Sequence, residues 1–413
     1  MRPNRLDRQL RIEGWNQKVL ENAKIGVVGD NDLLSSLYIM SASALGINNI
    51  VVIAPDLDDR LIEIAKKINL YFKLTHVEGF YTHPAMAELF KGCHLVVDLS
   101  HYGLANKLLI EKGFRDRIPI ISGFCYEENG KQGLKVFSYL KGREWQELEQ
   151  IVSTVNLPNN HFDDGVLDII ITGIILEETK NLLMDQDASD DLISYHRPKI
   201  KPSNDQPKIL IVGSGALGIF VGLGLAYSGF QNLSFMDPDT VEVTNLNRQV
   251  LFYNAIGKSK AETLSTKLNT LFGIGSLAEI AYFDKNSNIE FYDAVFDCVD
   301  NFETRIVLSE KCMDQRKILI SGGTSPHAGQ VITYNPIDDG TTPAELLGMY
   351  DIVEQRHPET YQRERAACIY QPDPSVIMTN QIAAGFMVDS YRRLVDGQKP
   401  ENVFYDSTSN TKF

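Results

Sequence analysis

The residues of this chain best suited to chemistry gather around one glycine-rich turn. The strand-like run KILIVG, Lys208–Gly213, leads into GSGALG, where Gly213, Gly215 and Gly218 form a GxGxxG pattern. Glycines at this spacing permit a tight turn and let backbone N–H groups at a helix start approach a phosphate. Asp237 follows the next predicted strand, where a carboxylate can accept a hydrogen bond from a ribose hydroxyl. The pattern predicts a nucleotide site, although many dinucleotide oxidoreductases share it.

A second set of polar residues follows the ribose carboxylate. The box DPDTVEVTNLNRQ, residues 237–249, carries Asn245, Arg248 and Gln249, and GKSK places Lys260 at the start of a further predicted helix. Hydride transfer develops no phosphate charge, whereas phosphoryl or nucleotidyl transfer needs cations beside a triphosphate. We therefore expect ATP chemistry and regard a nicotinamide-dependent oxidoreductase as the weaker alternative.

A further carboxylate ends the predicted strand in DAVFDCVDN, residues 293–301. The carboxyl ends of parallel strands form the ligand-binding edge of such sheets, and Asp300 lies there. A carboxylate beside a triphosphate is suited to hold Mg²⁺. Two simpler interpretations are that Asp300 caps the predicted helix Phe302–Met313 and that Arg248 is a surface residue.

The elements that carry these residues occur twice in the chain. KIGVVG at Lys24–Gly29 matches KILIVG at Lys208–Gly213, 184 positions later, and HLVVDLSHY at His94–Tyr102 matches Asp293–Asn301, 199 positions later. Strands and helices alternate in both copies, which is typical of a doubly wound α/β fold. We expect two tandem Rossmann-like domains in a pseudo-twofold arrangement, as in a dimer fused into one chain.

The first copy lacks the nucleotide residues. In place of GSGALG it reads GDNDLL, Gly29–Leu34, with two acids that would repel phosphate. By the two offsets, Asp237 corresponds to Ile53 and Asp300 to His101. We expect this copy not to bind ATP.

The apolar pattern also predicts domain boundaries. The expected parts are an inactive domain over 1–184, a linker over 185–206, an active domain over 207–413 with a short crossover segment at 337–374, and two matching apolar helices at 164–184 and 375–395.

Composition narrows the classes of function. The 413 residues hold 40 basic and 54 acidic side chains, a net charge of −14, which argues against nucleic-acid binding. The most apolar run, Val166–Leu176, is too short to cross a membrane, and no signal peptide is visible. Five cysteines without a CxxC pair fit a reducing compartment, so we expect a cytoplasmic protein.

Taken together, these motifs resemble a known family. The second copy is similar to the adenylation domain of the ubiquitin-activating (E1) superfamily, which includes ThiF and MoeB. The resemblance rests on GSGALG, the 237–249 box, GKSK and DCVDNFETR, and on SVIMTNQIAAGFMVDSYRRL, which resembles the crossover helix. RLDRQLR, Arg5–Arg11, in a predicted helix Asn4–Asn22, resembles the family's opening RYxRQ helix.

The resemblance implies roles for individual residues and an activity. The residues it assigns to Mg-ATP are Gly213, Gly215 and Gly218 around the nucleotide, Asp237 on the ribose, Asn245, Arg248, Gln249 and Lys260 toward the phosphates, Asp300 on Mg²⁺, and Arg8, with Arg5, reaching the site from the N-terminal helix. The implied reaction adenylates the C-terminal carboxylate of a ubiquitin-like or sulfur-carrier protein ending in glycine. Adenylation of a ribosomal peptide, as in MccB-like activators, and a non-catalytic ATP-bound adaptor are the alternatives.

One cysteine is a candidate nucleophile. Cys368 lies before the final predicted helix, where ThiF- and MoeB-like proteins carry a cysteine, and Arg363 and Arg365 would favour its thiolate. The resemblance implies a thioester on Cys368, with an E2-like protein as a possible later partner; a structural thiol is the alternative. A monomer with an internal pseudo-dimer and a homodimer, in which Arg8 reaches a neighbouring chain, are both compatible with the sequence.

Overall fold

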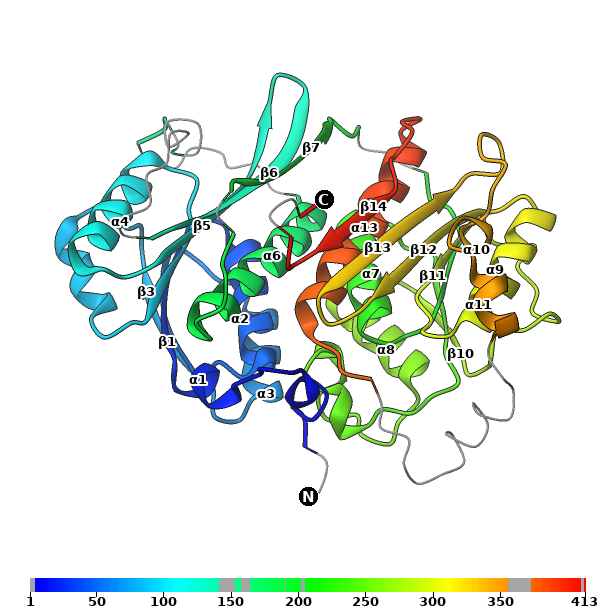
Figure 1. Cartoon of the computed structure of the whole chain (residues 1–413), viewed down its shortest axis with the longest axis horizontal. Helices are drawn as coiled ribbons and strands as arrows, with labels where there is room; N and C mark the ends of the chain where they lie inside the picture. Colours follow the sequence, from blue (N-terminus) through cyan, green and yellow to red (C-terminus); the bar gives the residue numbers. More distant parts are fainter. Residues whose placement is uncertain are drawn as a thin grey trace.

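Two seven-stranded sheets, one in each half of the chain, form the frame of the protein (Figure 1). The computed structural model describes residues 4–140, 152, 154–156, 164–189, 191–201, 205–355, 373–409 and 412–413. The strand orders are β3-β2-β1-β4-β5-β6-β7 and β10-β9-β8-β11-β12-β13-β14. In each sheet the first five strands of that order are parallel and the last two are antiparallel. This shared topology confirms the expectation of two tandem, doubly wound α/β units.

The first sheet and its helices span the N-terminal half. Their bounds are a 3-10 helix Gln9–Arg11, α1 Gln17–Asn22, β1 Lys24–Gly29, α2 Asp32–Leu45, β2 Asn49–Ala54, α3 Asp59–Ile68, β3 Lys73–Glu78, a 3-10 helix Pro84–Phe90, β4 Leu95–Leu99, α4 Gly103–Asp116, β5 Ile120–Glu128, β6 Lys131–Tyr139, α6 Gly165–Leu183 and β7 Ile193–Pro198.

The second sheet repeats this order with its own insertions. Its bounds are β8 Ile209–Val212, α7 Ala216–Tyr227, β9 Leu233–Met236, 3-10 helices Val243–Asn245 and Val250–Phe252, α8 Lys260–Phe272, β10 Leu277–Glu279, β11 Ala294–Asp297, α9 Phe302–Asp314, β12 Ile318–Thr324, β13 Ala328–Tyr334, α10 Pro343–Leu346, α11 Met349–Gln355, α13 Ile377–Val395 and β14 Val403–Asp406.

Two segments differ from the sequence-based expectation. The predicted helix Asn4–Asn22 is divided, because Gly14 adopts a positive φ of 74° between the first 3-10 helix and α1. The predicted linker 185–206 contains β7, which pairs with β6 as the last strand of the first sheet. Its side chains alternate between buried and exposed positions, with Ile193 and Arg197 buried, which is the period of a strand.

The two halves meet along their long apolar helices, α6 and α13, at the centre of the molecule (Figure 1). A Cβ on Gly173 of α6 would lie 2.6 Å from Ile382 of α13, and a Cβ on Gly385 of α13 would overlap Ile170 of α6. Each helix therefore presents a glycine to an isoleucine of the other. Such reciprocal contacts are the mark of a twofold interface, here within one chain.

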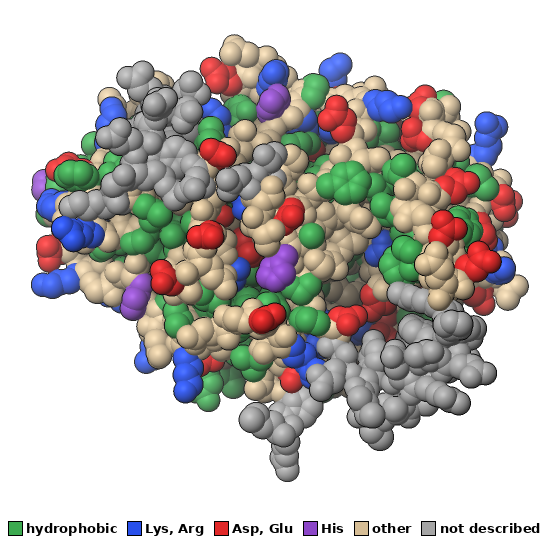
Figure 2. All heavy atoms as spheres, in the orientation of Figure 1, with side chains coloured by type: hydrophobic (Ala, Val, Ile, Leu, Met, Phe, Trp, Pro, Cys, Tyr) green, Lys and Arg blue, Asp and Glu red, His purple; other side chains and the backbone are tan. Residues whose placement is uncertain are grey.

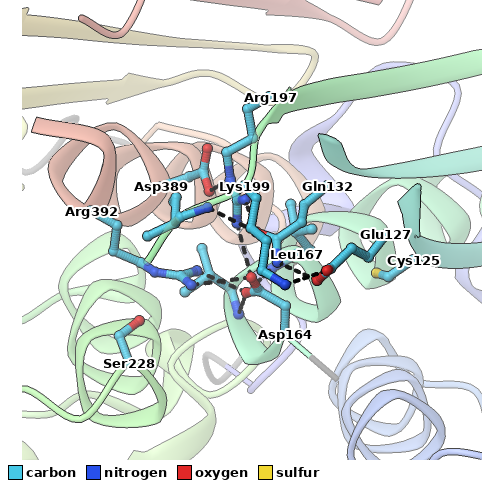
Figure 3. Close-up of polar contacts among 12 residues, drawn as sticks. Cys125, Glu127, Gln132, Asp164, Leu167, Arg197, Lys199, Ser228, Asp389 and Arg392 are labelled. Carbon is cyan, nitrogen blue, oxygen red and sulfur yellow. Dashed lines mark hydrogen bonds and ion pairs between the residues drawn. The ribbon is translucent and has the colours of Figure 1, made fainter. Parts of the chain in front are cut away.

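A buried network of charges closes this interface (Figure 3). Arg197 on β7 donates from Nε to Asp389 on α13 at 2.6 Å and from Nη2 to Asp164 at 2.9 Å. Arg392 on α13 donates to both oxygens of Asp164, which in turn caps α6. Although burial favours the protonated acid, the two arginines hold the pKa of Asp164 below its ordinary value. The network ties the first sheet to the final helix of the second half.

The surface is acidic, as the composition requires. In Figure 2, acidic side chains are scattered over the visible face and are densest over the second half, on the right of the view. Within the described ranges, no helix combines the length and the apolar character needed to cross a bilayer.

Candidate nucleotide site

The glycine turn joins β8 to α7 and has two distinct parts. Gly213 has a φ of 95°, and a Cβ there would lie 2.5 Å from the carbonyl oxygen of Cys298. The fold itself therefore requires glycine at this position. Gly215 is the N-cap of α7, and a Cβ there would meet only Nε2 of Gln249, at 3.6 Å. The small size of Gly215 keeps space open at the helix N-terminus, where an anion is stabilised.

Asp237 lies directly beside the turn. Its Oδ2 accepts a hydrogen bond from the Ser214 N–H at 2.6 Å, and its Oδ1 accepts one from the Asp239 N–H at 2.8 Å. Burial raises the pKa of Asp237, against the opposing charge of Lys260. The strand registers also correct the alignment of the two copies: Val28 pairs with Ile53 and Val212 with Met236, so Asp237 corresponds to Ala54 rather than Ile53. The first copy still lacks the acid.

Lys260 is the first residue of α8, and its side chain extends toward Asp237 and Asp239. Its Nζ lies 2.8 Å from Oδ2 of Asp239, in an ion pair whose lysine is mostly buried and whose aspartate is 59% exposed. An ion pair with one exposed partner contributes little stability. Lys260 can therefore exchange Asp239 for a phosphate oxygen at low cost.

Arg248 is buried within the same edge of the sheet. Its Nη1 donates to the Thr244 carbonyl at 3.1 Å and to Oδ1 of Asn247 at 2.8 Å. The pKa of Arg248 is lowered to about 9, mainly by burial and to a smaller extent by the charge of Arg8, against the opposing charges of Asp300 and Glu242. Asn247, which holds Nη1 of Arg248, also donates to Gln9, the residue that follows Arg8 in the chain. The interpretation of Arg248 as a surface residue is wrong.

The neighbouring Asn245 is used locally. It ends a 3-10 helix, and its Oδ1 accepts a hydrogen bond from the Glu242 N–H at 2.8 Å, which completes a capping box. Asn245 is buried, so the box holds the backbone that leads into Arg248 in one conformation.

The two N-terminal arginines have different surroundings. Arg8 donates from Nη1 to the carbonyl of Asp373, just before α13, at 2.9 Å, so it reaches the second half within one chain. Arg5 donates to the carbonyls of Ala44 and Ser43 at the C-terminal end of α2, at 2.6 and 3.4 Å. Burial lowers the pKa of Arg5 to about 10. The structure brings Arg8 to the site, whereas the hydrogen bonds of Arg5 hold the N-terminal segment on α2.

Asp300 is exposed on the turn that follows β11. The side chain of the next residue, Asn301, caps α9 by accepting a hydrogen bond from the Thr304 N–H at 2.8 Å. The interpretation of Asp300 as the helix cap is therefore wrong, and its carboxylate is available at the edge of the sheet.

Arg305 supports this edge and escaped the sequence-based prediction. It donates to the carbonyls of Val299 and Gly322 and lies 3.4 Å from Asp297, which also accepts from Ser321 Oγ at 2.6 Å. These contacts hold the turn after β11 against β12. Arg305 is the arginine of DCVDNFETR and the fourth residue of α9, and its place in that motif was the one sign of its role in the sequence.

Two buried polar atoms beside the glycine turn have no hydrogen-bond partner among the described residues. They are Oγ of Ser214 and Oε1 of Gln249. Ser214 lies between the first two glycines of the turn, and Gln249 faces Gly215. Because buried polar groups are normally paired, these atoms fit a site that receives a polar ligand.

The first copy fills the corresponding space with its own side chains. Asp30 takes the place of Ser214, and its carboxylate accepts a hydrogen bond from the His101 N–H at 2.7 Å and contacts Nδ1 of that ring at 2.8 Å. His101 takes the place of Asp300. A buried carboxylate at this helix start would repel a phosphate.

Among the described cysteines none is suited to nucleophilic chemistry. Cys93, Cys125, Cys298 and Cys312 are buried, and burial raises the pKa of Cys93, Cys298 and Cys312. A buried thiol with a raised pKa is poorly reactive. Cys368, with Arg363 and Arg365, lies outside the described residues.

The glycine turn, its carboxylate and the surrounding cations are those of a nucleotide-binding α/β protein. The sequence model of the ThiF family matches residues 199–412, more than half of the chain. The protein belongs to the ThiF family, which confirms the resemblance to the E1 superfamily.

Curated relatives share the second half. The chain is 34% identical over 203 residues to the adenylyltransferase and sulfurtransferase MOCS3 of Drosophila yakuba, covering 46% of this chain and 43% of that protein. It is 34% identical over 138 residues to a probable molybdopterin-synthase adenylyltransferase of Porphyra purpurea, covering 32% and 35%. The chain thus spans less than half the length of these relatives.

Solved structures show a more distant likeness. A crystal structure of E. coli MccB with AMPCPP and MccA aligns at a TM-score of 0.41 and 20% identity, covering 49% of this chain and 61% of that one. A structure of E. coli MccB with ATP aligns at the same TM-score and identity.

Proposed function

We propose that this protein activates a carboxylate by adenylation, with the second half as the working site and the first half as its scaffold. The observation that carries the proposal is that the buried Arg248 adjoins Gln249, whose Oε1, like Oγ of Ser214, is buried beside the glycine turn without a partner among the described residues. The like charges of Arg8 and of the deeply buried Arg248 form a site that an oligophosphate would neutralise. Hydride transfer develops no charge on a phosphate and so makes no use of such cations.

The residues of the second half divide the work of binding ATP. Gly213 and Gly218 permit the tight turn, because a Cβ at either would strike the backbone of Cys298 or of Gly213, and Gly215 leaves room for the nucleotide at the start of α7. Asp237 accepts from the ribose of the nucleotide. The groups assigned to the phosphates are Asn245, Arg248, Gln249, Lys260 and, from the first half, Arg8. Asp300 would hold Mg²⁺ together with phosphate oxygens, the ligands that this ion prefers, and Mg²⁺ would add charge neutralisation.

The substrate is proposed to be the C-terminal carboxylate of a sulfur-carrier or ubiquitin-like protein ending in glycine. A carboxylate oxygen attacks the α-phosphorus of ATP, and the bond from that phosphorus to the bridging oxygen of the β-phosphate breaks. The products are an acyl-adenylate and pyrophosphate, and no proton is transferred. The protein contributes position and positive charge.

The names of the curated relatives favour a sulfur carrier over a peptide substrate, since they include a sulfurtransferase and a molybdopterin-synthase adenylyltransferase. In the proposed second step the Cys368 thiolate attacks the acyl carbon of the adenylate, the bond from that carbon to the AMP oxygen breaks, and AMP leaves. A thiol of an E2-like protein would then take the acyl group and release the Cys368 thiolate.

Pyrophosphate exchange into ATP tests the first step. Wild type is compared with Asp300→Ala and Arg248→Ala across candidate carriers that end in glycine, and Lys258→Ala, an exposed lysine near Lys260, is the matched control. We expect carrier-dependent exchange that falls at least a hundredfold in the two site variants and is unchanged in the control. ATP binding without exchange for any carrier would favour the adaptor instead.

The thiol is tested in the same samples. A carrier adduct that DTT releases, present in wild type and absent in Cys368→Ser, would support the thioester. An adduct that DTT still releases from Cys368→Ser would exclude this residue, because an ester on the serine oxygen resists DTT.

A further inference from the structure

Asn247 has no role in the reaction proposed above, yet it is fully buried beside Arg248. Its Nδ2 donates to Oε1 of Gln9 at 3.2 Å and to the carbonyl of Ser375 at 3.0 Å. Its Oδ1 accepts from Nη1 of Arg248 at 2.8 Å. Both donors and the acceptor of this amide are therefore used.

Each of these bonds goes to a different part of the fold. Gln9 belongs to the N-terminal 3-10 helix, and its Nε2 donates to Gln17 at 2.6 Å and to the carbonyl of Leu45 at 2.8 Å. Leu45 ends α2, so a continuous chain of hydrogen bonds runs from α2 of the first half through Gln9 and Asn247 to Arg248.

The third bond reaches the start of α13. Ser375 comes two residues before that helix, and Asp373, which accepts from Arg8, comes two residues earlier still. Arg8 and Gln9 are adjacent in sequence. Asn247 and Arg8 thus fasten the same short stretch of chain, next to the two arginines assigned to the phosphates.

We propose that Asn247 is a positioning residue that fixes the guanidinium of Arg248 between the N-terminal segment and the start of α13. The proposal rests on the proposed function, in which Arg248 contacts the phosphates. Nη1 is held by Thr244 and Asn247, while Nε and Nη2 form no hydrogen bond with the described residues and are left for a ligand. A guanidinium held in advance loses less conformational freedom on binding.

The experiment measures the affinities for ATP and for adenosine by calorimetry. Asn247→Leu removes all three hydrogen bonds, and Asn247→Ser, which is smaller, is the second variant in case the first does not fold. Both are also made in an Arg248→Ala background. Adenosine is the internal control because it lacks the phosphates that Arg248 would contact.

We expect Asn247→Leu to lower the affinity for ATP about tenfold and the affinity for adenosine less than about twofold. In the Arg248→Ala background the same substitution should lower the affinity for ATP no further, since the arginine that Asn247 positions is absent. Equal weakening of both ligands, or a full additional loss in the double variant, would overturn the positioning role. If wild type binds neither ligand, the nucleotide site itself fails, which is a separate result.

Discussion

Arg248 is buried in the second half, and the charge of Arg8, from the N-terminal segment of the same chain, adds to the effect of that burial in lowering the pKa of Arg248. The first copy has lost its own nucleotide residues, but it supplies this cation to the second. Two adjacent guanidinium groups destabilise each other until an anion lies between or beside them. The site is therefore arranged electrostatically for a ligand of high negative charge.

Arg8 is expected to act within its own chain. Arg8→Ala should weaken ATP binding about tenfold or more through the loss of one charge-assisted contact. The decisive measurement mixes Arg8→Ala chains with Arg248→Ala chains. If Arg8 completes the site of its own chain, the mixture should bind ATP no more tightly than either variant alone. Recovery on mixing would show that arginine and site come from different chains.

Substitution of the first two glycines of the turn should have different effects, on stability at Gly213 and on ATP binding at Gly215. Gly213→Ala places a Cβ against the Cys298 carbonyl in a backbone conformation that alanine avoids, so it should destabilise the fold by roughly 2 kcal/mol or more. Gly215 has a φ of −74°, and its Cβ would meet only Gln249 at 3.6 Å. Gly215→Ala should therefore keep the melting temperature of wild type and lose ATP affinity. Thermal melting and calorimetry separate the two, and unchanged ATP affinity in Gly215→Ala would contradict this assignment.

Breaking the central charge network should be costly. Arg197→Met leaves the buried Asp389 without its ion-pair partner, and removal of one member of such a pair costs about 3–5 kcal/mol. The control is Arg60→Met, which removes a 55% exposed arginine from its pair with Asp58 and should cost less than about 1 kcal/mol. Urea denaturation measures both. Similar losses in the two variants would argue against a special contribution from the network.

Asp98, in the silenced copy, should make stability depend on pH. Burial raises the pKa of Asp98 to about 6, with a smaller contribution from Asp30, whereas the unfolded value is about 3.9. Between these values the native state binds more protons than the unfolded state, so this residue's contribution to stability falls as pH rises from about 4 to 6. Asp98→Asn should remove that dependence.

Denaturation at pH 4.5 and at pH 7 tests this sign. On going from pH 4.5 to pH 7, wild type should lose roughly 1–3 kcal/mol of unfolding free energy relative to Asp98→Asn. A difference that does not change with pH would refute the raised pKa.

The sequence predicted the repeated order of strands and helices because that information is local. The periodicity of Ile209–Val212, the glycines after it and the apolar helix at Ile377–Val395 each lie within a few turns of chain. The alignment of Asp237 failed by one residue, since the extra length between the copies can be assigned only from strand pairing.

The supporting contacts of the site were not predictable in this way. Asn247 meets Gln9 across 238 positions and Ser375 across 128, and no local pattern encodes such a meeting. Arg305 was visible only as a charged residue in a helix, and its four acceptors come from two strands, β11 and β12, and from the turn after β11. Side chains that bind a ligand follow recognisable motifs, whereas those that hold the ligand-binding side chains depend on tertiary structure.

The reciprocal packing of Gly173 and Gly385 has a consequence for how this protein can vary. In a dimer of identical chains, one codon change alters both sides of the interface at once. Here the two sides are encoded separately, and they have diverged: Arg197 of β7 corresponds by strand register to Ser407, which follows β14. The two halves are also synthesised together, in a fixed ratio of one to one that no mismatch in expression can disturb.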